Sequence, residues 1–427
     1  MVSKLIKSKI LIGVIGQGYV GLPLSIEFGK KLNVIGFDIN SERINELNHK
    51  KDRNNDIKLK EFKLSKNISF TDNISDLSNC NVYIITVPTP ITKKKIPNLK
   101  HIKQACSAIS TFLKKGDVVI LESTVYPGVS EDVCVPILEK KSKLIFNEDF
   151  FFGYSPERIN PNDNEHKITD IVKVTSGSNL KTLNFVDNLY KQIIKAGTYQ
   201  VSNIKIAEAA KVIENAQRDI NIAFINELCL IFDKLNINTN QVLKAASTKW
   251  NFINFKPGIV GGHCIGVDPY YLTHKSIISG YAPKIITAGR EINDNFTSFI
   301  IKKAIKSCQK KFKEKNFKFL ILGLTFKENC VDYRNSKSIE LANLLIKKKY
   351  ITHCYDPLLK IDEFNLKNKI QIIKKPKQNY YHCVIISVAH NYFVNLGEKK
   401  IKTFLKNDGF IFDIKNIYPY NNENLYL

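Results

Sequence analysis

The chain lacks an apolar run of the length that a membrane-spanning helix needs. Such a helix takes about 20 consecutive apolar residues, so we expect no membrane span. Basic residues do precede an apolar run near the start of the sequence, as they do in a signal peptide. This run leads into closely spaced glycines and not into a small-residue cleavage site, so we interpret it as a first strand. We therefore expect a cytoplasmic protein.

The sequence also lacks any C-x-x-C pair, and its nine cysteines are an odd number. Both facts argue against a disulfide framework and a structural zinc site, so we expect reduced thiols and no bound metal. Most of the cysteines stand in apolar runs, where a thiol behaves as a small hydrophobe. Cys264 differs, because it has glycines on both sides and Asp268 four residues later in VGGHCIGVDPYYL (260–272).

Arginine is scarce in this basic chain. Only six of the 64 basic residues are Arg, while the formal net charge is +24. Proteins that bind nucleic acid cluster their basic residues, use arginine for bidentate contacts and interleave stacking aromatics. Here lysine is spread along the whole chain. We interpret the charge as a solvated lysine surface that attracts anionic small molecules, and we expect no nucleic-acid partner.

A chain of 427 residues is too long for a single core. Short apolar runs alternate with helical patterns over residues 1–200, which predicts a doubly wound, mostly parallel sheet. Residues 203–235 contain no Pro or Gly and carry apolar residues at helical spacing, so they predict a long helix that packs against a second copy. The strand-helix alternation returns from about residue 315. The expected fold is α/β, with Rossmann-like domains at 1–200 and 306–427 joined by a central helical dimerisation region at 201–305.

The first strand ends in the motif GVIGQGYVGLPLS (13–25), which has the spacing G-x-G-x-x-G. A strand before the glycines and a helix after them are the context that a dinucleotide fingerprint requires. The glycines allow a tight turn, and the exposed N–H groups at the start of the helix bind phosphate. The residues that we expect to bind NAD here are Gly16, Gly18, Tyr19, Val20 and Gly21.

Asp38 closes the second apolar run, 22 residues after Gly16. An acidic group at this place accepts hydrogen bonds from the adenosine ribose, and its charge repels a 2′-phosphate. The sequence therefore predicts NAD rather than NADP. Arg43 nearby weakens this preference slightly and is counted among the cofactor-binding residues. The alternative is that Asp38 is a solvated turn aspartate.

Three further features lie where a substrate would bind. Lys211 and Asn215 are four residues apart on the long predicted helix and so share a face. Thr124 follows one strand-like run, and Glu157 and Arg158 follow another. In doubly wound sheets, ligands bind at the carboxyl ends of the strands. None of these features alone decides the reaction, and a solvated stripe is the alternative for the helix pair.

Cys264 narrows the range of dehydrogenase reactions that fit the sequence. A dehydrogenase that only interconverts an alcohol and a carbonyl needs no nucleophile, whereas one that forms an acid must capture the intermediate aldehyde. A thiolate does so as a thiohemiacetal, which gives up a second hydride to become a thioester that water releases. A nearby lysine stabilises the oxyanion. The alternative is a structural cysteine in a glycine-rich turn.

Taken together, these residues make the chain similar to the UDP-glucose/GDP-mannose dehydrogenase family over nearly its full length. The resemblance implies an NAD-binding Rossmann domain, a helical dimerisation region and a C-terminal UDP-binding α/β domain. It also implies oxidation at C6 of a nucleotide-linked hexose to a carboxylate with two NAD.

The resemblance implies a role for each matching residue. Cys264 corresponds to the nucleophile and Asp268 to its polar partner. Lys211 and Asn215, in AEAAKVIENAQRD, correspond to the pair that holds the oxyanion and a catalytic water. Thr124 in ESTVYPG and Glu157 in YSPERIN correspond to the residues that position water and aid proton transfer.

Further residues are implied to bind the two ligands. On the cofactor side they are Thr124, Pro88 and Thr89 of VPTP (87–90), and Arg334 of GLTFKENCVDYRNS (323–336). On the substrate side they are Glu157, Arg158, Lys211, Asn215, Gly261, His263, Tyr270, Lys327 and Arg290 of GREIND, the last acting across a homodimer or higher homo-oligomer.

Two departures from the family pattern bear on the sugar. UDP-glucose enzymes usually have Ser before the cysteine and Lys before the aspartate, where this chain has His263 and Val267. The form GGHCIGVDPYYL resembles the branch that acts on UDP-N-acetylglucosamine or UDP-N-acetylgalactosamine. The expected product is a UDP-N-acetylhexosaminuronic acid for surface polysaccharide such as capsule or O-antigen. UDP-glucose and UDP-N-acetylmannosamine remain alternative substrates, and a general-base role is an alternative for His263.

Two other classes of protein stay open. A two-electron β-hydroxyacid-type dehydrogenase also pairs a Rossmann domain with a helical lysine, but such proteins are generally shorter and lack the cysteine motif. A non-catalytic protein that binds NAD or nucleic acid would have no use for the reacting residues.

Overall fold

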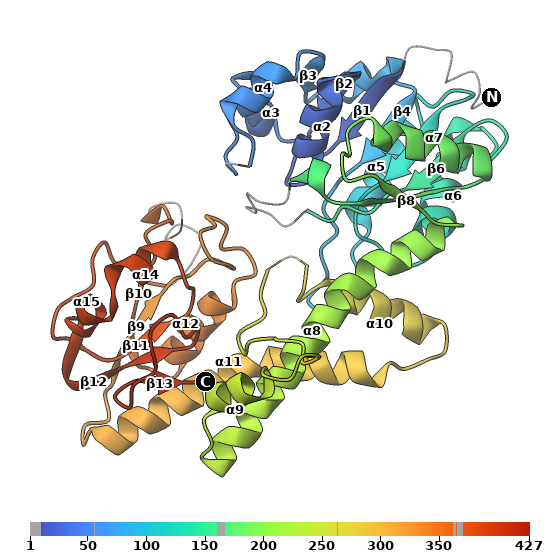
Figure 1. The fold of residues 1–427 in the computed structure, drawn as a ribbon. Helices are drawn as coiled ribbons and strands as arrows, with labels where there is room; N and C mark the ends of the chain where they lie inside the picture. Colours follow the sequence, from blue (N-terminus) through green and yellow to red (C-terminus); the bar gives the residue numbers. More distant parts are fainter. Residues whose placement is uncertain (1–9, 55, 160–166, 263, 362–363, 365–369) are drawn as a thin grey trace. The chain divides into compact units, whose positions relative to one another are not determined.

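The computed structural model describes residues 10–54, 56–159, 167–262, 264–361, 364 and 370–427 (Figure 1). The chain forms two compact units. The first comprises Met1–Glu214 and Tyr270–Ala282, and the second comprises Asn215–Pro269 and Pro283–Leu427. The α/β fold class with two mainly parallel sheets and a long central helix is confirmed.

The first unit is built on an eight-stranded sheet with the order β3-β2-β1-β4-β5-β6-β7-β8. Neighbouring strands are parallel except β6 and β7, which run antiparallel. The parallel pairs follow from the crossover helices that the sequence predicts between strands. The strands are β1 (Leu11–Ile15), β2 (Asn33–Phe37), β3 (Ile68–Thr71), β4 (Val82–Ile85), β5 (Val118–Leu121), β6 (Phe151–Tyr154), β7 (Lys173–Gly177) and β8 (Thr198–Gln200).

Helices cover this sheet. Apolar side chains of α2 and α7 pack on one face, where Phe28 and Tyr190 meet the strand residues Val14 and Ile84. Helix α5 lies against β4 and α6. The helices of this unit are α2 (Gly21–Gly29), α3 (Ser41–Asn48), α4 (Leu59–Leu64), α5 (Lys100–Ile109), α6 (Val135–Ser142), α7 (Leu180–Lys191), the 3₁₀ turns η1 (Ile74–Asn79) and η3 (Ile168–Asp170), and the π-helical turn η2 (Ser130–Cys134).

The carboxyl ends of β1, β2, β4, β5 and β6 share one edge of the sheet, because these strands are parallel. The glycine motif, Asp38, Thr124 and Glu157 all follow these strand ends. Since β7 runs the other way, its first residue, Lys173, lies at the same edge. The strand order reverses between β1 and β4, which is where doubly wound sheets bind nucleotides.

The long predicted helix is α8 (Ile204–Leu235), and its prediction is confirmed. The side chain of Asn203 accepts a hydrogen bond from the N–H of Ile206 at 3.0 Å, which satisfies a backbone donor in the first turn. The boundary between the two units falls inside this helix, between Glu214 and Asn215.

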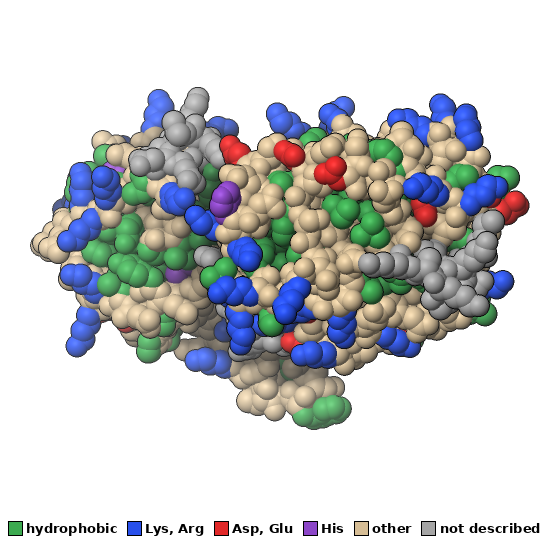
Figure 2. Space-filling view, turned by 90° about the horizontal axis from the view of Figure 1, so that it is seen from above, with side chains coloured by type: hydrophobic (Ala, Val, Ile, Leu, Met, Phe, Trp, Pro, Cys, Tyr) green, Lys and Arg blue, Asp and Glu red, His purple; other side chains and the backbone are tan. Residues whose placement is uncertain are grey.

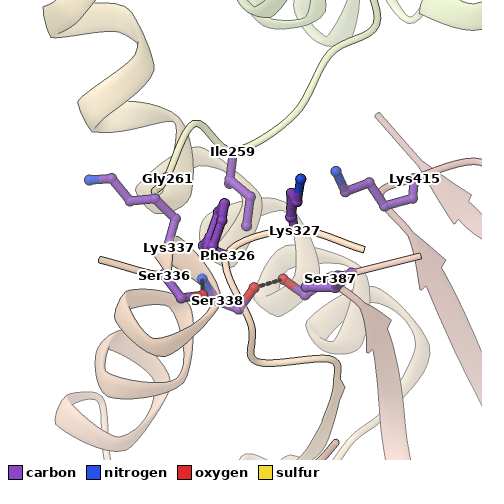
Figure 3. Close-up of a pocket in the computed structure, with 10 residues that line it drawn as sticks. Ile259, Gly261, Phe326, Lys327, Ser336, Lys337, Ser338, Ser387 and Lys415 are labelled. Carbon is purple, nitrogen blue, oxygen red and sulfur yellow. Dashed lines mark hydrogen bonds between the residues drawn. The ribbon is translucent and has the colours of Figure 1, made fainter. Parts of the chain in front are cut away.

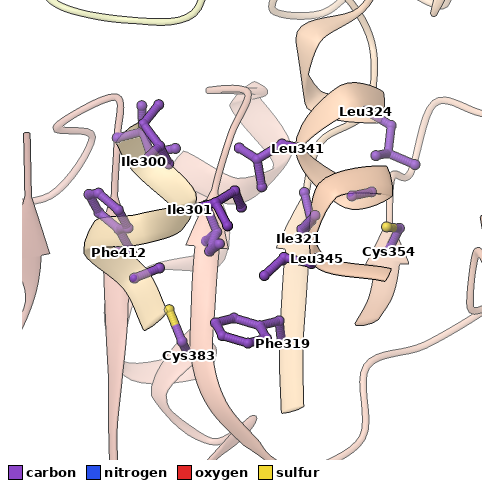
Figure 4. Packing of buried hydrophobic residues seen from close by; sticks show 14 of the residues in the cluster. Ile300, Ile301, Phe319, Ile321, Leu324, Leu341, Leu345, Cys354, Cys383 and Phe412 are labelled. Carbon is purple, nitrogen blue, oxygen red and sulfur yellow. The ribbon is translucent and has the colours of Figure 1, made fainter. Parts of the chain in front are cut away.

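The second unit contains a five-stranded parallel sheet with the order β10-β9-β11-β12-β13. Figure 4 shows its core, in which Ile301 of α11 and Leu345 of α12 pack onto Phe319 of β9. The elements are α9 (Thr239–Ala246), α10 (Asp268–Ile278, which the unit boundary crosses), α11 (Lys284–Lys311), β9 (Lys318–Leu322), α12 (Lys337–Lys347), β10 (Ile351–Tyr355), β11 (Tyr381–Ile386), α14 (Asn391–Leu396), α15 (Glu398–Lys402), β12 (Leu405–Asp413) and β13 (Leu425–Tyr426).

The cysteines divide into two groups. Eight are buried, among them Cys354 and Cys383 in the core of the second unit (Figure 4). Burial raises the pKa of the Cys308 thiol to about 12 and that of Cys229 to about 11, because the interior disfavours the thiolate. Cys264 is exposed. The eight buried thiols therefore act as small hydrophobes.

Lysine and arginine side chains are spread over the face shown in Figure 2, with other side chains between them. Across the part of the chain that the structure describes, no helix combines the length and the apolar character needed to span a membrane. No group of three or more His, Cys, Asp or Glu among those same residues is placed to hold a metal ion.

Candidate active site

The glycine motif forms a tight turn between β1 and α2. Gly16 has a φ of +98°, which favours glycine. A Cβ on Gly21 would lie 1.8 Å from the carbonyl oxygen of Gly16, so only glycine fits there. A Cβ on Gly18 would meet no atom within 4 Å. The loop thus leaves open space beside the first turn of α2, and this arrangement fits the pyrophosphate of a dinucleotide.

Asp38 is fixed at the end of β2. Its Oδ2 accepts a hydrogen bond from the N–H of Gln17 at 2.7 Å, and its Oδ1 accepts one from the N–H of Asn40 at 2.9 Å. The carboxylate therefore faces the glycine loop, where a ribose hydroxyl would be recognised.

Arg43, which we expected among the cofactor-binding residues, lies against the glycine loop and is buried. Only 5% of this residue is exposed. Its Nε donates to the carbonyl oxygen of Gln17 at 2.9 Å, and its NH2 is 2.8 Å from Oδ1 of Asp52. The guanidinium supports the glycine loop from behind.

Two strand-end segments of the first unit lie side by side. The hydroxyl of Ser123, next to Thr124, donates to the carbonyl oxygen of Val87 at 2.6 Å. The hydroxyl of Tyr271 donates to the carbonyl oxygen of Thr89 at 2.6 Å. The VPTP segment, which contains Pro88, therefore contacts the Thr124 loop and the start of α10.

The Glu157 segment is tied to α8. The NH2 group of Arg158 lies 2.6 Å from Oε1 of Glu214, which is three residues beyond Lys211. Lys211 is 8% exposed, and Asn215 follows it by four residues on the same helix. This ion pair brings the Glu157–Arg158 segment to the turn of α8 that carries Lys211.

Glu208 is a second link, which the sequence analysis missed. Its Oε2 accepts from the N–H of Gly128 at 2.6 Å, and its Oε1 accepts from the N–H of Ser130 at 2.9 Å. The loop that it holds begins at Thr124. Burial raises the pKa of Glu208 to about 7 against the lowering effect of these hydrogen bonds. Because Glu208 is three residues before Lys211, the helical spacing could have placed both on one face of α8. The sequence does not indicate that Glu208 is buried, since most acidic residues on helices are exposed.

Glu208→Gln is expected to remove a pH dependence of stability. Because the folded pKa of about 7 lies above the reference value of 4.5, the folded chain binds this proton more tightly. Wild-type stability therefore falls as the pH rises from about 4.5 to about 7, by roughly 3 kcal/mol. Glutamine does not titrate, so the Tm advantage of wild type over the variant should shrink across this window in thermal unfolding followed by circular dichroism.

The control for this measurement is Glu131→Gln. Glu131 lies on the same loop, with Oε2 3.4 Å from Nζ of Lys205 in a partly exposed pair. Removing Glu131 should change the pH dependence of the Tm far less than Glu208→Gln does, because the charge of Glu131 affects the pKa of Glu208 less than burial and the hydrogen bonds do. A Tm curve of Glu208→Gln that runs parallel to that of wild type would contradict a titration of Glu208 coupled to folding.

In the second unit, Cys264 stands in a turn before α10. Its carbonyl oxygen accepts from the N–H of Val267 at 3.0 Å and from that of Asp268 at 2.8 Å. Nδ2 of Asn215 donates to Oδ2 of the buried Asp268 at 2.6 Å. Three of the predicted reacting residues, namely Cys264, Asp268 and Asn215, thus meet within one unit. His263 lies outside the described residues.

A small pocket in the second unit lies next to the glycine turn before Cys264 (Figure 3). Gly261 lines it, and the ammonium groups of Lys327 and Lys415 point the same way at its rim. The hydroxyls of Ser338 and Ser387 are 2.6 Å apart at its base. Ammonium and hydroxyl groups donate hydrogen bonds to phosphate oxygens, so this cluster is suited to a phosphate ester. Lys415 was not among the predicted residues.

Arg334 and Arg290 are both paired with carboxylates of the second unit. NH2 of the exposed Arg334 lies 2.6 Å from Oδ2 of Asp332. Arg290, a predicted substrate ligand, is only 3% exposed, and its NH1 lies 2.6 Å from Oδ1 of Asp219. Its NH2 also pairs with Asp294. Within its own unit Arg290 is therefore a buried member of an ion-pair cluster, and its predicted contact with the substrate stays a prediction.

Three profiles of the UDP-glucose/GDP-mannose dehydrogenase family match the chain: the NAD binding domain over residues 10–194, the central domain over 205–295 and the UDP binding domain over 320–420. A UDP-N-acetyl-D-glucosamine 6-dehydrogenase of Pseudomonas aeruginosa is 49% identical over 97% of this chain and 99% of its own length. An enzyme of the same name from Salmonella typhi is 48% identical over 96% of this chain and 97% of its own.

Solved structures give a similar result. A UDP-D-ManNAc dehydrogenase from Pyrococcus horikoshii superimposes with a TM-score of 0.86 at 27% identity, covering 98% of each chain. A UDP-N-acetyl-mannosamine dehydrogenase from Staphylococcus aureus gives a TM-score of 0.83 at 27% identity over 97% of each chain.

Proposed function

Because the chain belongs to the UDP-glucose/GDP-mannose dehydrogenase family and is thus an NAD-dependent nucleotide-sugar dehydrogenase, we propose that it oxidises C6 of a UDP-N-acetylhexosamine to the carboxylate. The expected substrate is UDP-N-acetylglucosamine or UDP-N-acetylgalactosamine. The observation that carries the proposal is the exposed thiol of Cys264 in the turn that leads to Asp268. A four-electron oxidation requires such a nucleophile, because the aldehyde must be held between its two stages.

The choice of sugar is supported by two relatives. Both UDP-N-acetyl-D-glucosamine 6-dehydrogenases match the chain over nearly its full length, at 48% and 49% identity. Val267 supports the same choice, because an apolar residue stands beside Asp268 where UDP-glucose enzymes usually carry lysine. We expect the uronic acid product to serve the synthesis of surface polysaccharide, and the reaction to take place in the cytoplasm.

In the proposed chemistry the C6 alcohol first loses a hydride and a proton to become an aldehyde. The thiolate of Cys264 then adds to this aldehyde, and the thiohemiacetal loses a second hydride to become a thioester. Lys211 stabilises the oxyanion at each tetrahedral stage. Asp268, held by the amide of Asn215, is the polar partner of the turn that presents the thiol. Thr124 and Glu157 hold the water that releases the acid from Cys264.

NAD, when bound, accepts one hydride at each of the two oxidation stages. The residues that we propose to hold it are the glycine loop with Tyr19 and Val20, Asp38 at the ribose, and the VPTP and Thr124 segments; Arg334 stays a proposal from the resemblance. The open space at Gly18 supports this assignment. We propose Arg43 as a support of the loop rather than a cofactor ligand, because it is buried against Asp52.

We propose that the UDP group lies along the rim of the pocket of the second unit, because the pocket itself is too small to enclose it. Lys327 supplies positive charge for the diphosphate, and Lys415 does so too although its Nζ lies 3.0 Å from Oε1 of Glu328. The match of residues 320–420 to a UDP binding domain supports this place. Tyr270, Arg158 and the segment around Gly261 and His263 remain proposed contacts of the sugar. The division into 1–200, 201–305 and 306–427 is part of this proposal and is supported by the ranges of the three family profiles.

We also propose a homodimer formed through α8. Five exposed apolar residues follow one line along this helix at spacings of 7, 11, 7 and 4. A stripe of this kind is typical of a helix that packs against a partner. The five residues of this stripe are Ile206, Ile213, Phe224, Ile231 and Leu235. Sedimentation equilibrium that gives only the monomer mass of 48.8 kDa would overturn the dimer.

The substrate is tested with a panel of UDP-sugars scored for NADH formed per mole of sugar. UDP-N-acetylglucosamine or UDP-N-acetylgalactosamine should give the highest kcat/KM, with two NADH per sugar. A higher kcat/KM for UDP-glucose or UDP-N-acetylmannosamine would overturn the choice of sugar. A yield of one NADH per sugar would overturn the four-electron reaction.

A further inference from the structure

We propose that Lys173 is a positioning residue that holds the Glu157 carboxylate in place and aimed at the reacting water. The inference rests on the proposed function, in which Glu157 and Thr124 hold that water. Lys173 stands in the run IVKVTSG (171–177), and its side chain lies at the site edge only because of how that run folds.

The antiparallel strand accounts for the position of Lys173. Tyr154 of β6 pairs with Ser176 of β7, so the first residue of β7 lies beside the residues that follow β6. The hydroxyl of Ser155 donates to the carbonyl oxygen of Val174 at 2.7 Å and continues this pairing toward Glu157. Strand β5 flanks β6 on its other side, and Glu122 follows it directly. Two strand ends and one strand start therefore meet at a single point.

The Lys173 ammonium is buried there, with 3% of the residue exposed. Its Nζ lies 2.6 Å from Oε2 of Glu122, 3.3 Å from Oε2 of Glu157 and 3.2 Å from the carbonyl oxygen of Pro156. An ammonium has three protons, and these three acceptors match them in number. Such a charge is held in the interior only because it is paired on two sides.

The second oxygen of Glu157 is bound as well. Its Oε1 accepts from the N–H groups of Arg158 and Ile159, each at 2.6 Å. The carboxylate therefore has one oxygen on the backbone and the other on Lys173, which sets its orientation. The guanidinium of Arg158 does not replace Lys173, because its NH2 pairs with Glu214.

The charges around Lys173 decide what it does. Burial tends to lower its pKa, but Glu122 and Glu157 outweigh burial and raise the pKa, so the ammonium stays charged. Tyr190 contributes its ring, 5.1 Å from Nζ, and its hydroxyl donates to Glu122. Without Lys173, two buried carboxylates would stand together with no cation. Burial already raises the pKa of Glu122 to about 7, and two neighbouring carboxylates without a cation favour the uptake of a proton further.

The first test is the pH profile of kcat for Lys173→Met in the full-length enzyme with NAD and the preferred UDP-sugar. We expect kcat at neutral pH to fall about tenfold, with the KM for the sugar nearly unchanged. The acid limb of the profile should move to higher pH, because the ionised carboxylate has lost its cation. Lys173→Arg keeps the charge and should restore most of the wild-type profile.

Glu122→Gln gives a prediction of opposite sign, which holds even if Lys173→Met does not fold. This variant removes the carboxylate that competes for Lys173, so Lys173 pairs with Glu157 only. The acid limb should therefore move to lower pH. The double variant Glu122→Gln/Lys173→Met should return part of the way toward wild type, since only one carboxylate then stands without a cation.

The matched control is Lys191→Met. Lys191 also pairs with a buried carboxylate of the first unit, Asp187, at 2.7 Å, and Asp187 accepts from Thr175 on β7. This variant should lower the Tm without moving the profile. A profile for Glu122→Gln or for folded Lys173→Met that keeps the wild-type acid limb, or loses activity equally at every pH, would overturn the role of Lys173. No turnover of any UDP-sugar by wild type would instead overturn the proposed function.

Discussion

Cys264→Ser is expected to lower the rate of uronic acid formation about a thousandfold or more. A serine hydroxyl stays protonated near neutral pH and adds poorly to an aldehyde, so the reaction should stall at or before that stage. Because Cys264 is exposed, the Tm should change little. Chromatography of the UDP-sugar products, together with NADH yield, measures both the acid and any aldehyde that accumulates.

The control for this variant is Cys308→Ser. Cys308 is fully buried among apolar side chains, so a hydroxyl there should lower the Tm while the folded fraction keeps its kcat. Acid formation by Cys264→Ser at the wild-type rate would exclude the covalent mechanism. Equal loss of activity in both variants would show that the measurement reports stability and not nucleophilic attack.

Arg290→Met is expected to destabilise the second unit by roughly 3–5 kcal/mol. The change leaves the carboxylate of Asp219, a residue with 0% exposure, without its cation. Burial raises the pKa of Asp219, and Arg290 acts against this effect. Since water does not reach Asp219, no solvent would stabilise its carboxylate once Arg290 is removed. Urea denaturation followed by circular dichroism measures the change.

The double variant Asp219→Asn/Arg290→Met separates the pair from packing. It should recover part of the lost stability, because no buried charge remains unpaired. Unchanged stability of Arg290→Met with a raised KM for the UDP-sugar would contradict the structural role and favour the substrate contact expected from the resemblance.

Local patterns were enough for the elements that depend on neighbours in the sequence. The long helix at 203–235 follows from an uninterrupted apolar spacing, and α8 spans Ile204–Leu235. The glycine motif likewise follows from a spacing in which Gly21 must lack a Cβ, since that atom would overlap the carbonyl of Gly16. In both cases the physical constraint lies within about 10 residues of chain.

The parts that the sequence did not predict depend on partners far along the chain. Lys173 meets Glu122 across 51 residues, and Arg290 meets Asp219 across 71. The contact of Lys173 with Glu122 depends on the direction of β7. The sequence does not reveal this direction, because the alternation of side chains in a strand is the same whichever way the strand runs. A charge pattern cannot tell a buried ion pair from a ligand-binding arginine. The sequence therefore predicted ligand contacts for Arg43 and Arg290 but not the ion pairs in which the structure places them, and it predicted no role for Lys173.

The contrast between the eight buried thiols and Cys264 has a practical consequence. Iodoacetamide attacks thiolates, which the interior of this protein disfavours at Cys229, Cys308 and other buried positions. The native enzyme should therefore be alkylated at a single position, Cys264, and denatured protein at nine. The number of labels per chain therefore measures the fraction of folded protein in a sample. Protection of Cys264 by a UDP-sugar would measure substrate binding without turnover.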